Sequence, residues 1–124
     1  MLELDIYNKN FMRNSEKRRV YVSGKYGGKQ ENKDIIEQKI KELIAYDKRM
    51  GIENVVYISP VHCFGFLYDE VSYEKGIEMC LELLKTCDEI IFLDSWQDSR
   101  GANIEYGFAE AMKIPMYYAK RDNK

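Results

Sequence analysis

Four short apolar runs, each rich in β-branched or aromatic residues, alternate along the chain with segments of helical periodicity. The runs predict strands at residues 19–23, 54–59, 89–94 and 115–119. Such an alternation is typical of a parallel sheet with helices on both faces, because parallel neighbours are joined by helical crossovers. We therefore expect an α/β domain of the Rossmann or flavodoxin-like type. Its sheet should have four to five strands in the order 2-1-3-4.

Three helices are expected between these strands. The first runs from an N-cap at Asn32 to a stop at Gly51, the second begins after Ser72, and the third follows Gly101 and ends before Pro115. Their apolar residues recur at helical spacing: Ile36, Ile40, Leu43 and Ile44 in the first, Tyr73, Ile77, Cys80, Leu81, Leu84 and Cys87 in the second, and Ile104, Phe108, Ala111 and Met112 in the third.

A length of 124 residues fits one domain, so residues 1–124 are interpreted as a single unit. Residues 1–14 fit no strand–helix unit and are expected to form an N-terminal arm or an edge strand. A net charge of -2 argues against a nucleic-acid polymer as the partner. The sequence has neither a membrane-length apolar run nor a signal-peptide pattern. With three cysteines and no Cys-x-x-Cys pair, we expect a reduced, cytoplasmic protein without a metal or cofactor.

The segment from Asp94 to Glu105 is the strongest candidate for a ligand site. A buried strand ends there in a polar loop that contains Trp96 and turns on Gly101, and Glu105 is expected in the first turn of the next helix. A helix N-terminus offers unpaired N–H groups and partial positive charge to an anion such as a phosphate. Glu105 is a candidate nucleophile or general base, although acidic residues also suit this position by interacting with the helix dipole.

Several other residues are candidates, and some of them have alternative interpretations. The loop that follows the first strand contains Ser23, Gly24, Gly27 and Gly28, and it is either a ligand-binding loop or a tight turn. Tyr21 either orients a carboxylate or fills the core. Trp96 stacks on a base, closes the pocket or covers an apolar surface. His62 is interpreted as a loop histidine without a catalytic role, and Cys80 as a buried, inert thiol.

Three segments together resemble the nucleoside 2-deoxyribosyltransferase superfamily. They are residues 20–24 (Val-Tyr-Val-Ser-Gly) with the glycines at 27 and 28, residues 80–88 (Cys-Leu-Glu-Leu-Leu-Lys-Thr-Cys-Asp), and residues 99–107 (Ser-Arg-Gly-Ala-Asn-Ile-Glu-Tyr-Gly). The most similar subgroup is a small family of uncharacterised phage and bacterial domains. The 2′-deoxynucleoside 5′-phosphate N-hydrolases are more distant relatives. The resemblance extends over residues 19–119.

The resemblance implies attack on the N-glycosidic bond of a nucleoside or nucleotide. Glu105 matches the family's nucleophile, and Tyr21 matches the tyrosine that positions it. Ser99 stands where the phosphate-preferring hydrolases have serine, which implies a 5′-phosphate near Ser99, Arg100 and Gly101. Proteins of this superfamily are typically dimers or larger homo-oligomers. A stretch rich in aromatic residues is expected either to close over the pocket or to pack against a partner; it contains Phe64, Phe66, Tyr68 and Tyr73.

One departure from the family pattern concerns catalysis. Cys80 replaces the family's aspartate that handles the sugar and the proton for the leaving base, and losing a positioned acid typically costs about 10²–10⁴ in rate. Either Asp94, Asp98 or Glu78 takes over, or the protein binds its ligand without turnover. The alternative function is thus a non-catalytic nucleotide-binding protein, for instance a phage-type protein that sequesters a cyclic or NAD-derived nucleotide signal. A third interpretation is an interaction domain without a ligand.

Overall fold

The computed structural model describes residues 17–119. A parallel sheet with the strand order β2-β1-β3-β4 forms its centre, which confirms the predicted α/β class and the order 2-1-3-4. The strands are β1 (Arg18–Ser23), β2 (Val55–Ile58), β3 (Glu89–Phe92) and β4 (Met116–Tyr118). The helices are α2 (Gln30–Met50), α3 (Pro60–Phe64), α4 (Tyr73–Leu84) and α5 (Arg100–Met112), with 3₁₀ turns η1 (Gly65–Leu67) and η2 (Trp96–Asp98). The expected arm or edge strand at residues 1–14 lies outside the described residues.

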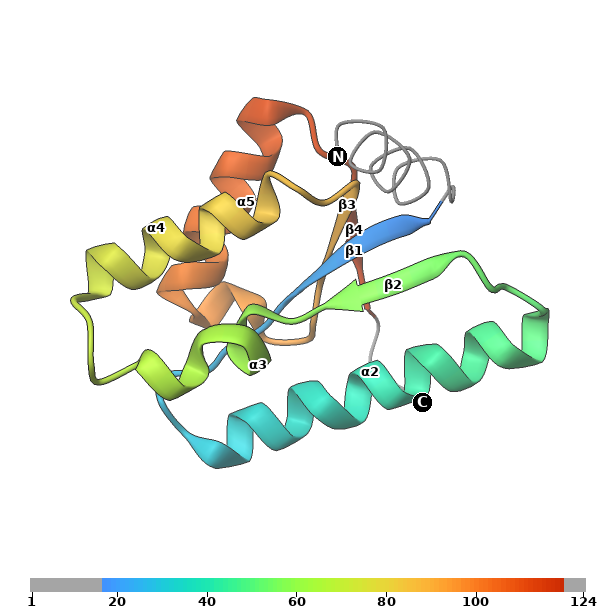
Figure 1. The fold of residues 1–124 in the computed structure, drawn as a ribbon, viewed down its shortest axis with the longest axis horizontal. Coiled ribbons are helices and arrows are strands. Elements are labelled where there is room, and N and C mark those ends of the chain that lie inside the picture. The colour runs from blue at the N-terminus through green and yellow to red at the C-terminus, as the bar shows by residue number, and fades with distance from the viewer. Residues whose placement is uncertain (1–16, 120–124) are drawn as a thin grey trace, which may run out of the picture.

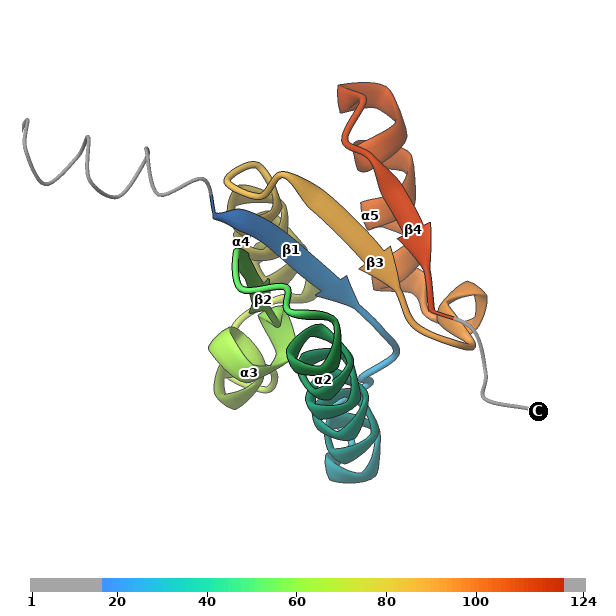
Figure 2. The ribbon, with the colours of Figure 1, turned by 90° about the vertical axis from the view of Figure 1, so that its right-hand side faces the viewer.

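Helices cover both faces of the sheet, with α4 and α5 on one face and α2 on the other (Figures 1 and 2). Successive side chains of a strand point to opposite faces, so each face has its own core. Tyr21 of β1 packs with Leu84 of α4 and Ala109 of α5. Its neighbour Val22 packs on the other face with Ile36 of α2.

Helix boundaries follow the predicted caps in two cases of three. Gly51 ends α2 in the left-handed conformation at φ 72°, and the Ser72 side chain accepts a hydrogen bond from the Lys75 N–H at the start of α4. The predicted N-cap at Asn32 is wrong, because α2 begins at Gln30 with Lys29 as its N-cap. Asn32 lies inside the first turn, where its side-chain amide donates to the Tyr26 carbonyl at 2.8 Å.

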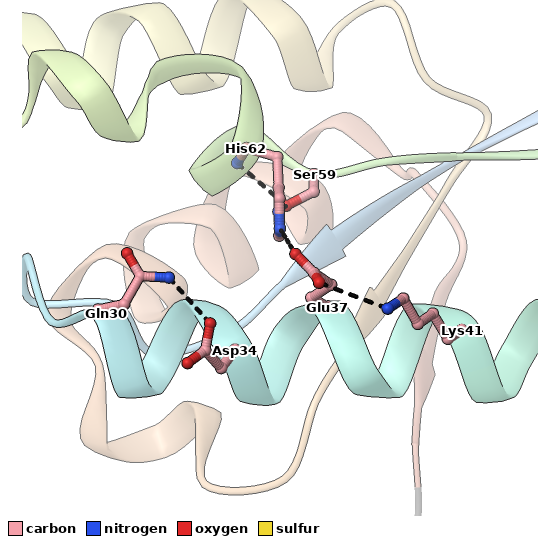
Figure 3. A network of polar contacts seen from close by, with 6 residues as sticks. All are labelled: Gln30, Asp34, Glu37, Lys41, Ser59 and His62. Atoms are coloured by element: carbon pink, nitrogen blue, oxygen red, sulfur yellow. Dashed lines mark hydrogen bonds and ion pairs between the residues drawn. The ribbon is translucent and has the colours of Figure 1, made fainter.

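The segment between β2 and α4 forms a short helix, α3, and the turn η1, neither of which the sequence pattern predicted. His62 therefore lies in a helix and not in a loop. Its Nδ1 is 2.8 Å from the Ser59 hydroxyl, and its Nε2 is 3.3 Å from the Glu37 carboxylate of α2 (Figure 3). These contacts tether α3 to the middle of α2.

Among residues 17–119, no helix is long and apolar enough to cross a membrane.

Candidate active site

A pocket of about 410 Å³ opens at the carboxyl ends of β1 and β2, between the N-terminus of α5, helix α4 and the α3–η1 segment. Its size is within the range of about 300–1,000 Å³ that small-molecule sites occupy. Ligands of parallel α/β sheets bind at this edge of the sheet. The loop after β1 contributes Gly24, Lys25, Tyr26 and Gly27, and the start of α5 contributes Ser99, Arg100, Gly101 and Glu105.

Glu105 is the buried carboxylate of this pocket, with 6% of its surface exposed. The Tyr21 hydroxyl donates to its Oε2 at 2.5 Å, and the Ser23 hydroxyl donates to its Oε1 at 2.7 Å. Residues 21 and 23 of β1 share one face of the strand because they are two positions apart. That face is the one covered by α4 and α5, so both hydroxyls point toward the same carboxylate and fix its orientation.

Helix α5 begins at Arg100, earlier than expected, so Glu105 lies in the second turn and not the first. The second turn places the carboxylate beneath the pocket and against the sheet, away from the water-exposed helix end. Burial raises the pKa of Glu105 above its ordinary value, while the hydrogen bonds from Ser23 and Tyr21 act in the opposite direction. The carboxylate is thus desolvated but supported by two donors.

Cys80 of α4 lies in the pocket wall, near Tyr21 and Glu105. Burial, together with the nearby Glu105 charge, raises the pKa of the Cys80 thiol to about 11. Burial and Glu105 also raise the pKa of Tyr21 well above its ordinary value. Both groups therefore keep their protons at neutral pH, and Cys80 presents a neutral thiol to the pocket.

The N-terminus of α5 combines a cap with a cation. Ser99 accepts a hydrogen bond from the Ala102 N–H at 3.1 Å, which completes the first turn of the helix. The Arg100 guanidinium lies over the Tyr73 ring, 4.6 Å from its centroid. Both Ser99 and Arg100 line the pocket, as does Gly101.

The glycine loop after β1 contributes to the pocket lining and also forms a tight turn. Gly24 and Gly27 line the pocket, whereas Gly28 does not. Gly28 has a φ of 75°, and a Cβ placed there would lie 2.8 Å from the Tyr68 ring. The turn at Gly28 thus lets the loop pack directly against the residue that follows η1.

Four predicted ligand residues are not among the pocket-lining residues: Ser23, Gly28, Asp94 and Trp96. Trp96 stacks on Tyr106 with a centroid separation of 5.1 Å and contacts Phe92 at 4.8 Å, so it covers the apolar face of β3. Asp94 is exposed at the end of β3. Of the three carboxylates considered as replacements at position 80, only Asp98 lines the pocket, and Glu78 is 3.4 Å from Lys75 on the exposed side of α4.

The wall opposite Glu105 was only partly foreseen. Phe64, Tyr68 and Tyr73 line the pocket, whereas Phe66 points away from it and is 77% exposed. Tyr26 and Tyr68 pack edge to face at 5.3 Å, joining the glycine loop to this wall. Aliphatic side chains complete it: Val61, Leu67, Val71, Ile77 and Met79.

No cluster of three or more potential metal ligands occurs within residues 17–119.

The fold and the pocket define a parallel α/β protein with a buried, hydroxyl-supported carboxylate at the carboxyl edge of its sheet. Residues 18–118 match a domain of unknown function, DUF4406, and the chain belongs to this family. No curated protein and no solved structure matches the chain.

Proposed function

We propose that this protein cleaves or transfers the N-glycosidic bond of a nucleotide, with Glu105 as the nucleophile. The observation that carries the proposal is the Glu105 carboxylate, which lines a ligand-sized pocket and receives hydrogen bonds from Tyr21 and Ser23. A buried carboxylate held in one orientation is suited to attack an anomeric carbon. The sequence resemblance to the nucleoside 2-deoxyribosyltransferase superfamily assigns the same role to Glu105 and Tyr21.

The reaction has two steps. A Glu105 oxygen attacks C1′ of the sugar, and the electron pair of the C1′–N bond leaves with the base. This step forms a glycosyl ester on Glu105. Water or a second base then attacks C1′, gives up its proton to the departed base anion and releases the carboxylate, which gives a hydrolase or a transferase respectively. Tyr21 and Ser23 keep the carboxylate aligned during both steps.

A 5′-phosphate is the expected second feature of the substrate. Ser99, Arg100 and Gly101 line the pocket where α5 begins, and this helix end carries partial positive charge. The Arg100 guanidinium adds a full charge. The phosphate assignment is supported by this pocket lining and by the resemblance, in which Ser99 matches the serine of the phosphate-preferring hydrolases.

The test is base release from nucleoside 5′-monophosphates and the corresponding nucleosides, followed by chromatography. Wild type is expected to release free base faster from the monophosphates. Glu105→Gln should abolish release while nucleotide affinity is retained. Glu110→Gln is the matched control, because Glu110 lies exposed on the same helix, outside the pocket lining. Undiminished release by Glu105→Gln would refute the nucleophile assignment.

The second candidate function is binding without turnover, and the neutral Cys80 thiol favours it. A pocket that holds a nucleotide but lacks a proton donor at position 80 would sequester a nucleotide signal, for instance a cyclic or NAD-derived one. Thermal-shift measurements with cyclic nucleotides, NAD and ADP-ribose select this candidate if they show stabilisation without chemical change of the ligand.

We further infer that the protein forms a homodimer or higher homo-oligomer. Two observations support this inference. Proteins of the superfamily that the sequence resembles are typically oligomers, and Phe66, Tyr68 and Tyr73 are exposed beside the pocket mouth. Analytical ultracentrifugation should give a mass at least twice 14.7 kDa, and a monomer at all concentrations would contradict the inference.

A further inference from the structure

The departure of a base from C1′ depends on whether the leaving base needs a proton. A neutral purine or pyrimidine leaves as an anion unless an acid protonates it, and a positioned acid contributes about 10²–10⁴ in rate. A base that already carries a positive charge leaves as a neutral molecule and needs no acid. The protonation state of the groups near Glu105 therefore bears on which substrates this pocket can cleave.

The groups closest to the Glu105 carboxylate are poor proton donors. The Tyr21 hydroxyl is already committed to Glu105 Oε2, and burial raises the pKa of this phenol well above its ordinary value. The Ser23 hydroxyl is committed to Oε1. Cys80 holds its proton with a pKa of about 11. Glu105 itself must be ionised in order to attack, so it cannot supply the proton in the same step.

The other carboxyl group of the pocket lining, Asp98, lies in a different setting. It is exposed in the 3₁₀ turn η2, beside the N-terminus of α5. Enzymes make a carboxyl group hold a proton at neutral pH by burying it in apolar surroundings. In this pocket lining, the carboxyl group so buried is Glu105.

The wall of the pocket formed by α3, η1 and α4 is apolar and aromatic. Every lining residue from Pro60 to Cys80 is uncharged, and Phe64, Tyr68 and Tyr73 are among them. The charged lining residues, Lys25, Asp98, Arg100 and Glu105, come from the glycine loop and from the η2–α5 segment. A cationic heterocycle is attracted to aromatic rings. The Tyr73 ring already carries the Arg100 guanidinium, so Phe64 and Tyr68 are the rings of this wall that would receive the base.

We propose that this pocket cleaves N-glycosides whose base is cationic, such as N-alkylated purine or N-ribosyl pyridinium nucleotides, in preference to those of neutral bases. The inference rests on the proposed function and names its substrate class. A Glu105 oxygen bonds to C1′, and the electron pair of the C1′–N bond neutralises the positive charge of the base. The base leaves without a proton. Water then displaces Glu105 from C1′ and gives up its proton to solvent.

The test compares 7-methylguanosine 5′-monophosphate with guanosine 5′-monophosphate, in the ribose and 2′-deoxyribose series. The two substrates share sugar, phosphate and ring system and differ in one methyl group and one charge. Nicotinamide mononucleotide is the pyridinium counterpart. Wild type should show a kcat/KM at least about a hundredfold higher for the cationic substrates, which corresponds to the contribution of a missing acid.

Two variants separate a proton effect from a packing effect. Cys80→Asp introduces a carboxyl group at the pocket wall and should raise the rate on guanosine monophosphate, so that the preference shrinks. Cys80→Ser is the matched control, because a hydroxyl of similar size is not an acid at neutral pH, and it should retain the preference. Equal shrinkage in both variants would contradict the proton argument.

The outcomes for the two proposals are distinguishable. Base release from both substrates within about tenfold of each other overturns the cationic-base inference and leaves the glycosidase proposal standing. Release from neither substrate overturns both. Strong preference for the cationic substrates that disappears in Glu105→Gln supports both.

Discussion

Tyr21 joins the central strand to the carboxylate of the pocket through a single hydroxyl group. Its hydroxyl donates to Glu105 Oε2 at 2.5 Å, and the ring is fully buried. Tyr21→Phe removes the donor without changing the ring. We expect a loss of about 1.5–3 kcal/mol in the free energy of unfolding above the pKa of Glu105, where a buried carboxylate loses a partner. Base release should fall about tenfold or more, because Glu105 loses one of the two hydrogen bonds that orient its carboxylate.

Tyr57→Phe is the control for this prediction. The Tyr57 hydroxyl donates to Asp47 Oδ2 at 2.6 Å, but Tyr57 is not among the residues that line the pocket. Its loss should cost about 1–2 kcal/mol of stability and leave base release at the wild-type rate. Chemical denaturation and the chromatographic assay measure the two effects separately. Equal activity losses in both variants would mean that Tyr21 acts only through stability.

At the scale of residues, the sequence predicted which side chains lie at or beside the pocket better than what each of them contacts. Tyr21 and Glu105 were paired through the family resemblance, and the structure brings them together. Ser23 was expected to bind ligand, yet it is fully buried and holds Glu105. Strand alternation contains this signal, because residues two apart share a face. Trp96 has no such signal, since its partner Tyr106 is brought near only by the packing of α5.

Replacing Gly51 and Gly107 by alanine should change the free energy of unfolding in opposite directions, because one glycine ends a helix and the other lies inside one. Gly51 ends α2 at φ 72°, a conformation that costs other residues about 1 kcal/mol, while Gly107 lies on the exposed face of α5. Nothing lies within 4 Å of a Cβ at either site. Gly51→Ala should therefore lower the free energy of unfolding by about 1 kcal/mol, and Gly107→Ala should raise it by about 0.5–1 kcal/mol. Urea titration measures both, and changes of the same sign would contradict the assigned helix boundaries.

Elements with a strong local signal were predicted from the sequence. The apolar runs gave the four strands to within two residues at either end, and Gly51 and Ser72 marked helix ends through their own backbone and side-chain chemistry. The α3–η1 segment was missed because it is too short for a periodic pattern. Its position depends on distant partners, among them Glu37 of α2, which meets His62 (Figure 3). This segment forms the apolar wall of the pocket, so the character of that wall could not be read from local patterns.

For the whole molecule, the buried acidic groups predict a loss of stability at alkaline pH. Burial raises the pKa of Cys80 to about 11 from a value of 9.0. Between these two values the unfolded chain has released a proton that the folded chain retains, so stability falls as pH rises. Tyr21 and Tyr57, whose pKa values are also raised by burial, continue the trend at higher pH.

Cys80→Ser removes one of these titrating groups. We expect its free energy of unfolding to fall less steeply than that of wild type between pH 9 and 11, as measured by urea titration at each pH. Parallel curves for the two proteins would show that the Cys80 thiol is as solvated in the folded chain as in the unfolded one.

The most direct measurement of the central claim is mass spectrometry of a trapped glycosyl ester. The probe is a 2′-fluoro nucleoside monophosphate that carries N7-methylguanine, because the fluorine slows breakdown of the ester and the cationic base needs no acid to leave. We predict a mass gain equal to the fluorinated sugar phosphate less one water, located on Glu105 by peptide sequencing and absent in Glu105→Gln. Release of base without an adduct on Glu105, or an adduct that persists in Glu105→Gln, would contradict the account.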